Sequence, residues 1–166
     1  MNEEWRAIPA YPKYEASNDG HIRTIKTERI LRPSRNQHGL LKVNLMKDGK
    51  TYTKNLNHIV AKAFLEPPTR KDFISIIHLD GDKNNCAASN LMWRPRYFAI
   101  KYHQQFDLKM YQTSNIPIVD IRTGEKYETI QEAVVRYGLL FTDILIATHE
   151  RTYVWPTYQE FRKIEN

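Results

Sequence analysis

The sequence predicts an α+β fold that combines small antiparallel β hairpins with short helices. Apolar residues alternate over 41–45 and an Asp-Gly pair follows at 48–49, a pattern typical of a hairpin. Apolar residues recur at helical spacing after Asn57 and again after Thr129. Prolines and turn residues separate these segments closely, so each element is short. With 166 residues and 41% hydrophobic content, the chain suits one domain or two small ones.

The first half of the chain favours turns and strands, followed by one helix. Asn-Asp-Gly at 18–20 suits a tight turn that leads into a strand around Ile22. In the hairpin, the alternating apolar residues would share one face, and the return strand would cover 51–56. A helix is predicted over 59–65, ended by the two prolines that follow it. His58, at its start, suits a cap or a packed imidazole, and a phosphate contact stays open as the alternative.

The second half alternates short strands with short helices. Strands are predicted at 73–77 and 91–93, and Pro95 opens a helix that runs to about His103. Farther on, a hairpin precedes two helices joined at Gly138, which resemble a helix-turn-helix, although any small helical hairpin gives the same pattern. The expected division is a β-rich module at 1–56, a ββα core at 57–104, a linker at 105–115 and a ββαα module at 116–166.

Charge is distributed unevenly along the chain. The net charge is +6, and residues 23–62 hold ten basic residues against two acidic ones. Residues 106–166 hold seven basic and nine acidic residues. Clustered cations gain affinity for phosphates by releasing counterions, so nucleic acid is the leading partner for the first half. The alternative is an ordinary solvated, lysine-rich surface.

Several other classes of protein are disfavoured by composition. Cys86 is the single cysteine, so an internal disulfide and a cysteine-rich zinc site are excluded. No apolar run approaches the roughly 20 residues that cross a bilayer, and residues 1–5 lack the basic start of a signal peptide. We therefore expect no membrane partner and a location in the cytoplasm, that of the host cell if a phage encodes the protein.

Three stretches carry a family signature. They are Trp-Arg-Ala-Ile at 5–8, His-Leu-Asp-Gly-Asp-Lys-Asn-Asn at 78–85 with Asn-Leu-Met-Trp at 90–93, and the hairpin with two helices at 116–155. In this order they resemble the phage intron-encoded homing endonucleases of the HNH family, with their N-terminal nuclease-associated module, nuclease core and C-terminal DNA-reading module. The resemblance implies that the ββα segment is an HNH-like, ββα-metal core.

The resemblance also implies roles for individual residues. By its place in the motif, His78 would be the general base that activates water, and Asn90 would hold the loop that carries it. In this family a divalent metal stabilises charge on the phosphate. Its usual ligand positions are Ile77 and Ala99 here, and neither side chain offers the oxygen that magnesium prefers. Possible substitutes are Asp80, Asp82 and His103.

Three functions are therefore weighed. The first is a DNA-binding protein with lost or weakened cleavage, which needs no cofactor. The second is an active nicking endonuclease, which would use Mg²⁺ or Mn²⁺ with substitute ligands. The third is a phage effector that binds a host protein. For the first two, the expected partner is double-stranded DNA, and the residues expected to contact it are Arg23, Lys26, Arg35, Lys42, Lys54, Arg94 and Arg96.

Overall fold

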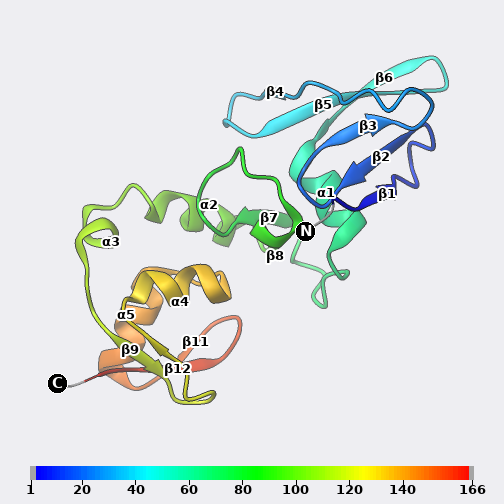
Figure 1. Ribbon diagram of the computed structural model, residues 1–166. Helices are drawn as coiled ribbons and strands as arrows, with labels where there is room; N and C mark the ends of the chain where they lie inside the picture. The colour runs from blue at the N-terminus through cyan, green and yellow to red at the C-terminus, as the bar shows by residue number, and fades with distance from the viewer. Residues whose placement is uncertain (1–2, 165–166) are drawn as a thin grey trace. The chain divides into compact units, whose positions relative to one another are not determined.

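The computed structural model describes residues 3–164 and forms two compact units (Figure 1). The N-terminal unit is Met1–Arg96 and the C-terminal unit is Tyr97–Asn166. Both mix short helices with small antiparallel sheets, so the predicted α+β class is confirmed. The division of the chain into four segments is finer than these two units and stays a prediction.

The first sheet of the N-terminal unit is a three-stranded meander in the order β1-β2-β3. Its strands are β1 (Trp5–Ala7), β2 (Tyr14–Ser17) and β3 (Ile22–Thr24). The Asn-Asp-Gly turn joins β2 to β3, and its glycine has a φ of 92°, a region that favours glycine. Ile25 lies beyond β3 and is 46% exposed.

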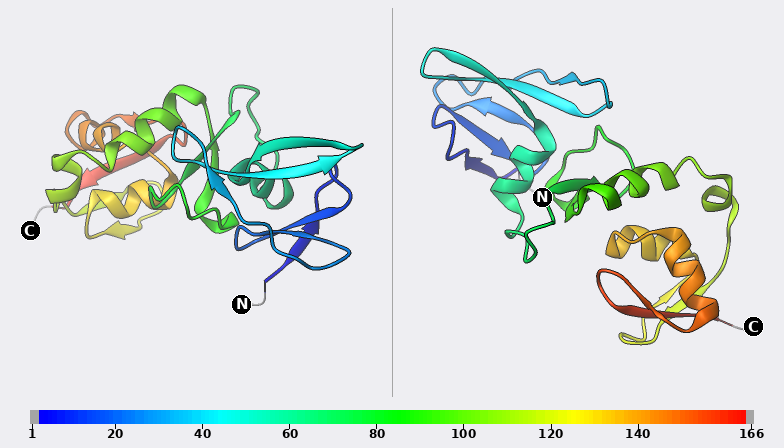
Figure 2. Two further views of the ribbon diagram at one scale, coloured as in Figure 1. Left: turned by 90° about the horizontal axis from the view of Figure 1, so that it is seen from above. Right: turned by 180° about the vertical axis from the view of Figure 1, so that it is seen from behind.

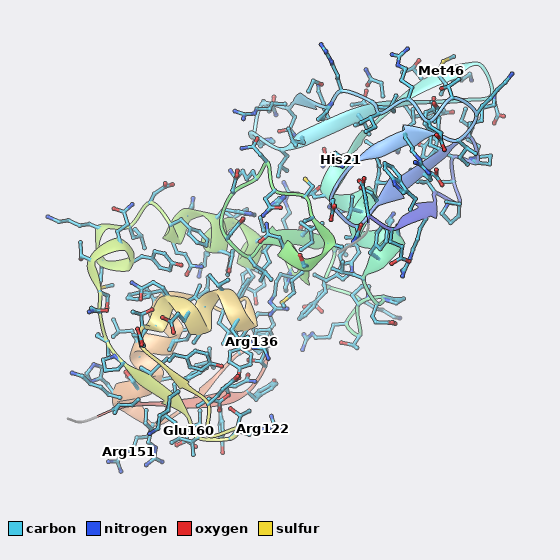
Figure 3. All side chains as sticks on the ribbon, in the orientation of Figure 1. His21, Met46, Arg122, Arg136, Arg151 and Glu160 are labelled. Carbon is cyan, nitrogen blue, oxygen red and sulfur yellow. The ribbon has the colours of Figure 1, made fainter. Side chains whose placement is uncertain are left out.

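The second sheet has the order β4-β5-β6 and carries the predicted hairpin. Its strands are β4 (Ser34–Arg35), β5 (Leu41–Lys47) and β6 (Lys50–Asn55). Asp48 and Gly49 both have positive φ, which matches the tight two-residue turn expected there. Met46 lies near the tip of this hairpin and is 54% exposed (Figure 3). The hairpin runs alongside β2 and β3 without continuing their sheet (Figures 1 and 2).

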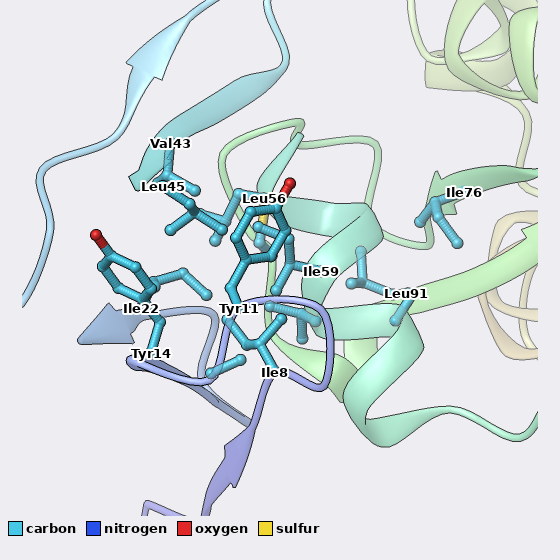
Figure 4. Packing of buried hydrophobic residues seen from close by; sticks show 14 residues of the cluster. Ile8, Tyr11, Tyr14, Ile22, Val43, Leu45, Leu56, Ile59, Ile76 and Leu91 are labelled. Carbon is cyan, nitrogen blue, oxygen red and sulfur yellow. The ribbon is translucent and has the colours of Figure 1, made fainter. Parts of the chain in front are cut away.

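Helix α1 (Leu56–Phe64) ties the unit together. It contacts both three-stranded sheets and also the β7–β8 ribbon, made of β7 (Ser75–His78) and β8 (Leu91–Arg94). A short 3-10 turn, η1 (Ala88–Asn90), precedes β8. Apolar residues from all these elements form one core (Figure 4). The N-terminal module and the ribbon are therefore parts of one folded body, because burial of apolar area stabilises them jointly.

The C-terminal unit begins with α2 (Arg96–Gln105), most of which belongs to it, and α3 (Lys109–Thr113). Its four-stranded sheet has the order β10-β9-β12-β11, and α4 and α5 pack against it. The remaining elements are β9 (Ile118–Asp120), β10 (Lys126–Tyr127), α4 (Ile130–Tyr137), α5 (Phe141–Glu150), β11 (Tyr153–Val154) and β12 (Gln159–Lys163).

This unit corrects the predicted ββαα arrangement, because two strands follow the helices. β12 pairs with β9 in the middle of the sheet, where Phe161 lies opposite Asp120 and is fully buried. β11 adds an edge strand beside it. The β12 segment is polar apart from one buried aromatic residue, so its sequence shows little alternation of apolar and polar residues. Which face of β12 is buried becomes clear only from its pairing with β9.

The expected linker is also more ordered than its composition indicated. Helix α3 occupies part of it, and Tyr111 is buried with its ring centroid 5.5 Å from that of Phe141. The side chain of Gln131 donates hydrogen bonds to the carbonyl oxygens of Tyr111 and Ser114. The segment is thus held on the C-terminal unit by a side chain from α4. No helix in the described part of the chain is long and apolar enough to cross a membrane.

Candidate functional site

His78 ends strand β7, opposite Leu91 of β8. Successive side chains in a strand point to opposite faces, so His78 shares a face with Ile76 while Ile77 lies on the other. Ile76 and Leu91 both belong to the core of the N-terminal unit. The sequence therefore directs the imidazole toward that core, and the exposed fraction of His78 is 0%.

The ring of His78 faces a buried thiol. Its Nε2 lies 3.9 Å from the Sγ of Cys86, which is 3% exposed. Burial, together with the nearby charge of Asp82, raises the pKa of the Cys86 thiol to about 11. The sulfur is therefore a neutral S–H group near pH 7, able to donate a weak hydrogen bond to the ring. Cys86 was not predicted to lie at this site, because a lone cysteine carries no pairing signal.

Asn90 holds the loop that joins the two strands. Its Oδ1 accepts a hydrogen bond of 3.0 Å from the backbone N–H of Asp80. Its Nδ2 donates to the carbonyl oxygen of Asn85 at 2.9 Å and to Oδ1 of Asp80 at 2.8 Å. Asn90 is 8% exposed, so these bonds satisfy groups that have little access to water.

The two loop carboxylates are engaged in the same network. Asp80 also accepts from the backbone N–H of Asp82 at 2.9 Å and from the side chain of Asn85 at 2.7 Å. Oδ1 of Asp82 accepts from the backbone N–H of Asn84 at 2.9 Å and from its side chain at 2.7 Å. The hydrogen bonds from Asn84 lower the pKa of Asp82, the backbone bond most of all. Both carboxylates therefore serve the turns of the loop.

The residues present do not fit a divalent metal in the manner of the family. Ile77 is fully buried and Ala99 is 6% exposed, and neither has a donor atom. His103 follows Ala99 by one turn of α2, and its Nδ1 donates to the carbonyl oxygen of Ala99 at 2.9 Å. Within residues 3–164, no three side chains of the His, Cys, Asp or Glu types are grouped so that they could hold an ion.

The N-terminal module supports the loop from outside. The backbone N–H of Ala88 donates to the carbonyl oxygen of Asn18 at 2.7 Å. Gly20 lies so close that an added Cβ would be 2.8 Å from the carbonyl carbon of Cys86. The glycine of the Asn-Asp-Gly turn is thus required for this close approach as well as for its positive φ. The turn signal was visible in the sequence, but its partner was not.

Lys42 and Lys54, two of the residues expected to contact DNA, lie on opposite faces of the β4–β5–β6 sheet. Lys42 shares the outer face with Asn44, because Val43 between them is buried. A polar hollow of about 310 Å³ on this face is lined by Arg29, Ile30, Leu31, Arg32, Ser34, Lys42 and Asn44. Arg29 and Arg32 belong to the basic tract of residues 23–62 but were not among the residues expected to contact DNA. We call this surface the outer face.

The other expected DNA contacts lie in different settings. Lys54 is opposite the buried Val43 in the register, which puts it on the face of the sheet away from Lys42. Arg23 is half-buried, paired with Glu15 and stacked on the ring of Trp5 at 4.0 Å.

Arg94 is more deeply buried than the remaining residues expected to contact DNA. It is only 5% exposed and donates to the carbonyl oxygen of Trp93 at 2.9 Å. Lys26, Arg35 and Arg96 are exposed. Among the residues expected to contact DNA, Arg94 is therefore the buried one.

In the C-terminal unit, α4 and α5 are joined through Gly138, which has a φ of 59°. Gln105 of α2 serves as a cap for α5, because its Oε1 accepts from the backbone N–H of Phe141 at 2.8 Å. Arg136 and Arg151 are exposed beside Glu132 and Glu150, and Figure 3 labels both arginines. The helix pair is compatible with a helix-turn-helix, whose DNA-reading role stays a prediction.

Comparison with known proteins places these features in context. Residues 3–46 match the NUMOD4 motif. The chain is 33% identical over 93 residues to the uncharacterized HNH endonuclease L245 of Acanthamoeba polyphaga mimivirus, covering 56% of this chain. It is 27% identical over 144 residues, 83% of this chain, to the uncharacterized HNH endonuclease L247 of the same virus. It is 32% identical over 91 residues, 54% of this chain, to the DNA endonuclease I-HmuI of Bacillus phage SP01.

The chain spans 27%, 36% and 51% of the lengths of these relatives, respectively. A solved structure of DNA binding and cleavage by the HNH homing endonuclease I-HmuI matches with a TM-score of 0.54 and 23% identity, covering 98% of this chain and 99% of that one. It shows a shared fold. The names of these relatives give no support to a host-protein partner. The chain therefore has HNH endonucleases among its homologues, carries the NUMOD4 motif and shares the fold of I-HmuI, which agrees with its resemblance to the HNH homing endonuclease family.

Proposed function

We propose that this chain is a DNA-binding protein whose phosphodiester cleavage is lost or weakened. One observation carries the proposal: the residue before His78, where the family has an acidic metal ligand, is the fully buried Ile77. Removing a metal ligand removes charge stabilisation of the transition state. Binding does not depend on that ligand, because contacts to phosphates come from other residues.

The other groups near His78 support the same conclusion. Asp80 and Asp82 already accept hydrogen bonds that hold the loop, so recruiting them to an ion would disrupt those turns. A general base must also reach the water from which it takes a proton. His78 is fully buried against Cys86, and the imidazole would have to be uncovered before it could act.

The outer face is the surface proposed to hold duplex DNA. Arg29, Arg32 and Lys42 line one polar hollow there. Neighbouring exposed cations include Lys26 and Arg35. Such a surface suits the phosphate backbone and carries little sequence preference by itself. Sequence preference would come from other elements, for which α4 and α5 are the candidates.

Binding is tested by titrating the protein against a duplex over a range of salt concentrations. If three phosphates are neutralised on the outer face, replacing Arg29, Arg32 and Lys42 by alanine lowers the slope of log K against log salt by about 3, at roughly 0.9 per contact. A matched control replaces Lys101, Lys109 and Lys126, which are exposed and lie in the C-terminal unit outside α4 and α5. Wild-type binding that ignores salt would contradict the proposal.

Cleavage is tested with supercoiled plasmid in the presence of magnesium or manganese. The wild-type protein should leave the plasmid closed or nick it only slowly. The alternative, an active nicking enzyme, predicts open circles that disappear in His78→Ala. The double variant Ile77→Asp, Ala99→Asn supplies an oxygen donor at each family position, and gain of nicking by a correctly folded double variant would identify the missing ligands as the cause.

A further inference from the structure

A second basic surface lies on the other side of the β5–β6 hairpin, between that hairpin and α1. We call it the α1 groove; its volume is about 620 Å³. It is lined by residues 8–11, Thr53, Lys54, Asn55, His58, Ile59, Lys62 and Ala63. Three of these side chains, Lys54, His58 and Lys62, can carry positive charge. Among the described lining residues none is acidic.

The α1 groove is separate from the outer face. Lys54 pairs with the buried Val43, whereas Lys42 and Asn44 on either side of Val43 point the opposite way. The lining residues of the two hollows do not overlap. The two hollows meet at β6, where Thr53 of the groove donates a hydrogen bond of 2.8 Å to Asn44 of the outer face, but Lys42 and Lys54 point to opposite faces of the sheet.

The start of α1 adds to the positive potential of the groove. Asn55, at the N-cap position, makes no side-chain cap hydrogen bond, and the described first turn contains no acidic residue. The positive end of the helix dipole is therefore not offset by a carboxylate. His58 and Lys62 are four residues apart, so they lie on one side of α1 and both face the groove.

We propose that the α1 groove binds a phosphodiester of a nucleic-acid backbone, as a contact additional to the outer face. The proposal rests on the DNA-binding function above. Charge complementarity selects the occupant: two lysines, a histidine that can be protonated and a helix N-terminus line a groove where no described side chain is negative. The N-terminal unit would then hold two segments of nucleic-acid backbone at once, one on each side of the β5–β6 hairpin.

Binding in this groove is coupled to a proton on His58. The ring is half-buried and stands edge-on to Trp93 at 5.8 Å between centroids. Burial, and then the charge of Lys62, lower the pKa of His58. The titratable groups facing it across the two adjoining hollows are Lys54, Lys62 and Tyr11. A bound phosphate reverses the local charge and raises that pKa, so the complex takes up a proton and tightens as the pH falls.

The test measures affinity for a duplex against salt and pH. Lys54→Ala, Lys62→Ala should lower the salt slope by about 2 and weaken binding about tenfold at moderate salt. The control pair, Lys13→Ala, Lys71→Ala, removes two exposed lysines that do not line either hollow and should change affinity less than about twofold. His58→Gln should flatten the dependence on pH between about 5.5 and 7.5. We call Lys54→Ala, Lys62→Ala the groove pair. If it changes the affinity and the salt slope no more than the control pair does, the proposal is wrong.

A second measurement separates this proposal from the proposed function. The pKa of His58 is followed by NMR of its ring protons, with the duplex or with inorganic phosphate as the probe. A rise with the duplex that the groove pair abolishes supports a nucleic-acid backbone in the groove. If the wild-type protein binds no DNA, the proposed function is wrong, and a nucleic-acid backbone cannot be the occupant of the groove. A rise in the pKa of His58 with inorganic phosphate alone then assigns the groove to a free anion. If neither probe raises the pKa, the groove is not an anion site.

Discussion

Two turns of the molecule, one in each unit, show how differently similar side chains can be supported. In the C-terminal unit, Asp120 holds the β9–β10 turn: its Oδ1 accepts from the backbone N–H of Arg122 and its Oδ2 from the hydroxyl of Tyr137, each at 2.9 Å. In the N-terminal unit, Asp80 holds the loop after His78 with the help of Asn90 and Asn85. The C-terminal turn is held from outside by the hydroxyl of Tyr137 and by the carbonyl oxygen of Glu160, which accepts from the backbone N–H of Ile121, whereas the loop after His78 is held by a network of its own side chains.

The loop after His78 is additionally held by another module. Gly20 packs on the backbone at Cys86, and Asn18 accepts from the backbone of Ala88. This support has the form expected of a rigid catalytic loop, in which position matters to a fraction of an ångström. It is present although Ile77, at a position that the family resemblance assigns to a metal ligand, has no donor atom. Under the proposed function, this support serves a scaffold that binds DNA.

The largest effect should come from Asn90→Ala. The change removes the partners of two part-buried groups, the backbone N–H of Asp80 and the carbonyl oxygen of Asn85. We expect a loss of about 3 kcal/mol in the free energy of unfolding, measured with urea. The control, Asn84→Ala, removes an exposed amide and should cost less than about 1 kcal/mol. Equal effects would show that the loop is held less firmly than the contacts indicate.

Gly20→Ala isolates the contribution of the N-terminal module. The new Cβ would meet backbone at 2.8 Å, and the φ of 92° adds strain. Gly49→Ala is the matched control, because its φ is also positive and nothing lies within 4 Å of the added atom. We expect about 1 kcal/mol from the unfavourable φ in the control and about 1 kcal/mol more at Gly20. Thermal unfolding of both variants measures the difference.

Tyr137→Phe tests the side-chain anchor of the β9–β10 turn. The variant loses the hydroxyl that donates to the fully buried Asp120. Removing one hydrogen bond to a buried charged group should cost about 1–2 kcal/mol, less than Asn90→Ala. Tyr153→Phe, at a tyrosine that is 66% exposed, is the control and should be neutral. A larger loss at Tyr137 than at Asn90 would reverse the order of the two turns.

The smallest effect concerns the thiol beside His78. Its pKa is raised to about 11 in the folded protein, so the folded state holds the proton more tightly than the unfolded state. This stability is fully present below the pKa of an unfolded thiol, near 8.5, and is lost as the pH rises toward 11. Between about pH 8.5 and 9.5 the wild-type protein should lose about 1 kcal/mol more than Cys86→Ala. Equal losses in urea unfolding would indicate an accessible thiol.

The sequence by itself determined the local elements of this protein and its resemblance to the HNH homing endonuclease family. The Asp-Gly turn, the alternation of β5 and the start of α4 at Thr129 depend on neighbours within a few residues, so short patterns were sufficient. The absence of oxygen donors at Ile77 and Ala99 was also readable directly, because it depends only on residue type.

Only the tertiary structure decided how distant residues combine. Pairing of β12 with β9 made it a central strand, the contact of Gly20 with Cys86 joined two modules, and strand register separated Lys42 from Lys54. Burial of His78 and Arg94 was likewise invisible in the sequence. The physical reason is that burial, register and close approach depend on what packs against a residue from elsewhere in the chain, and composition and spacing do not contain that information.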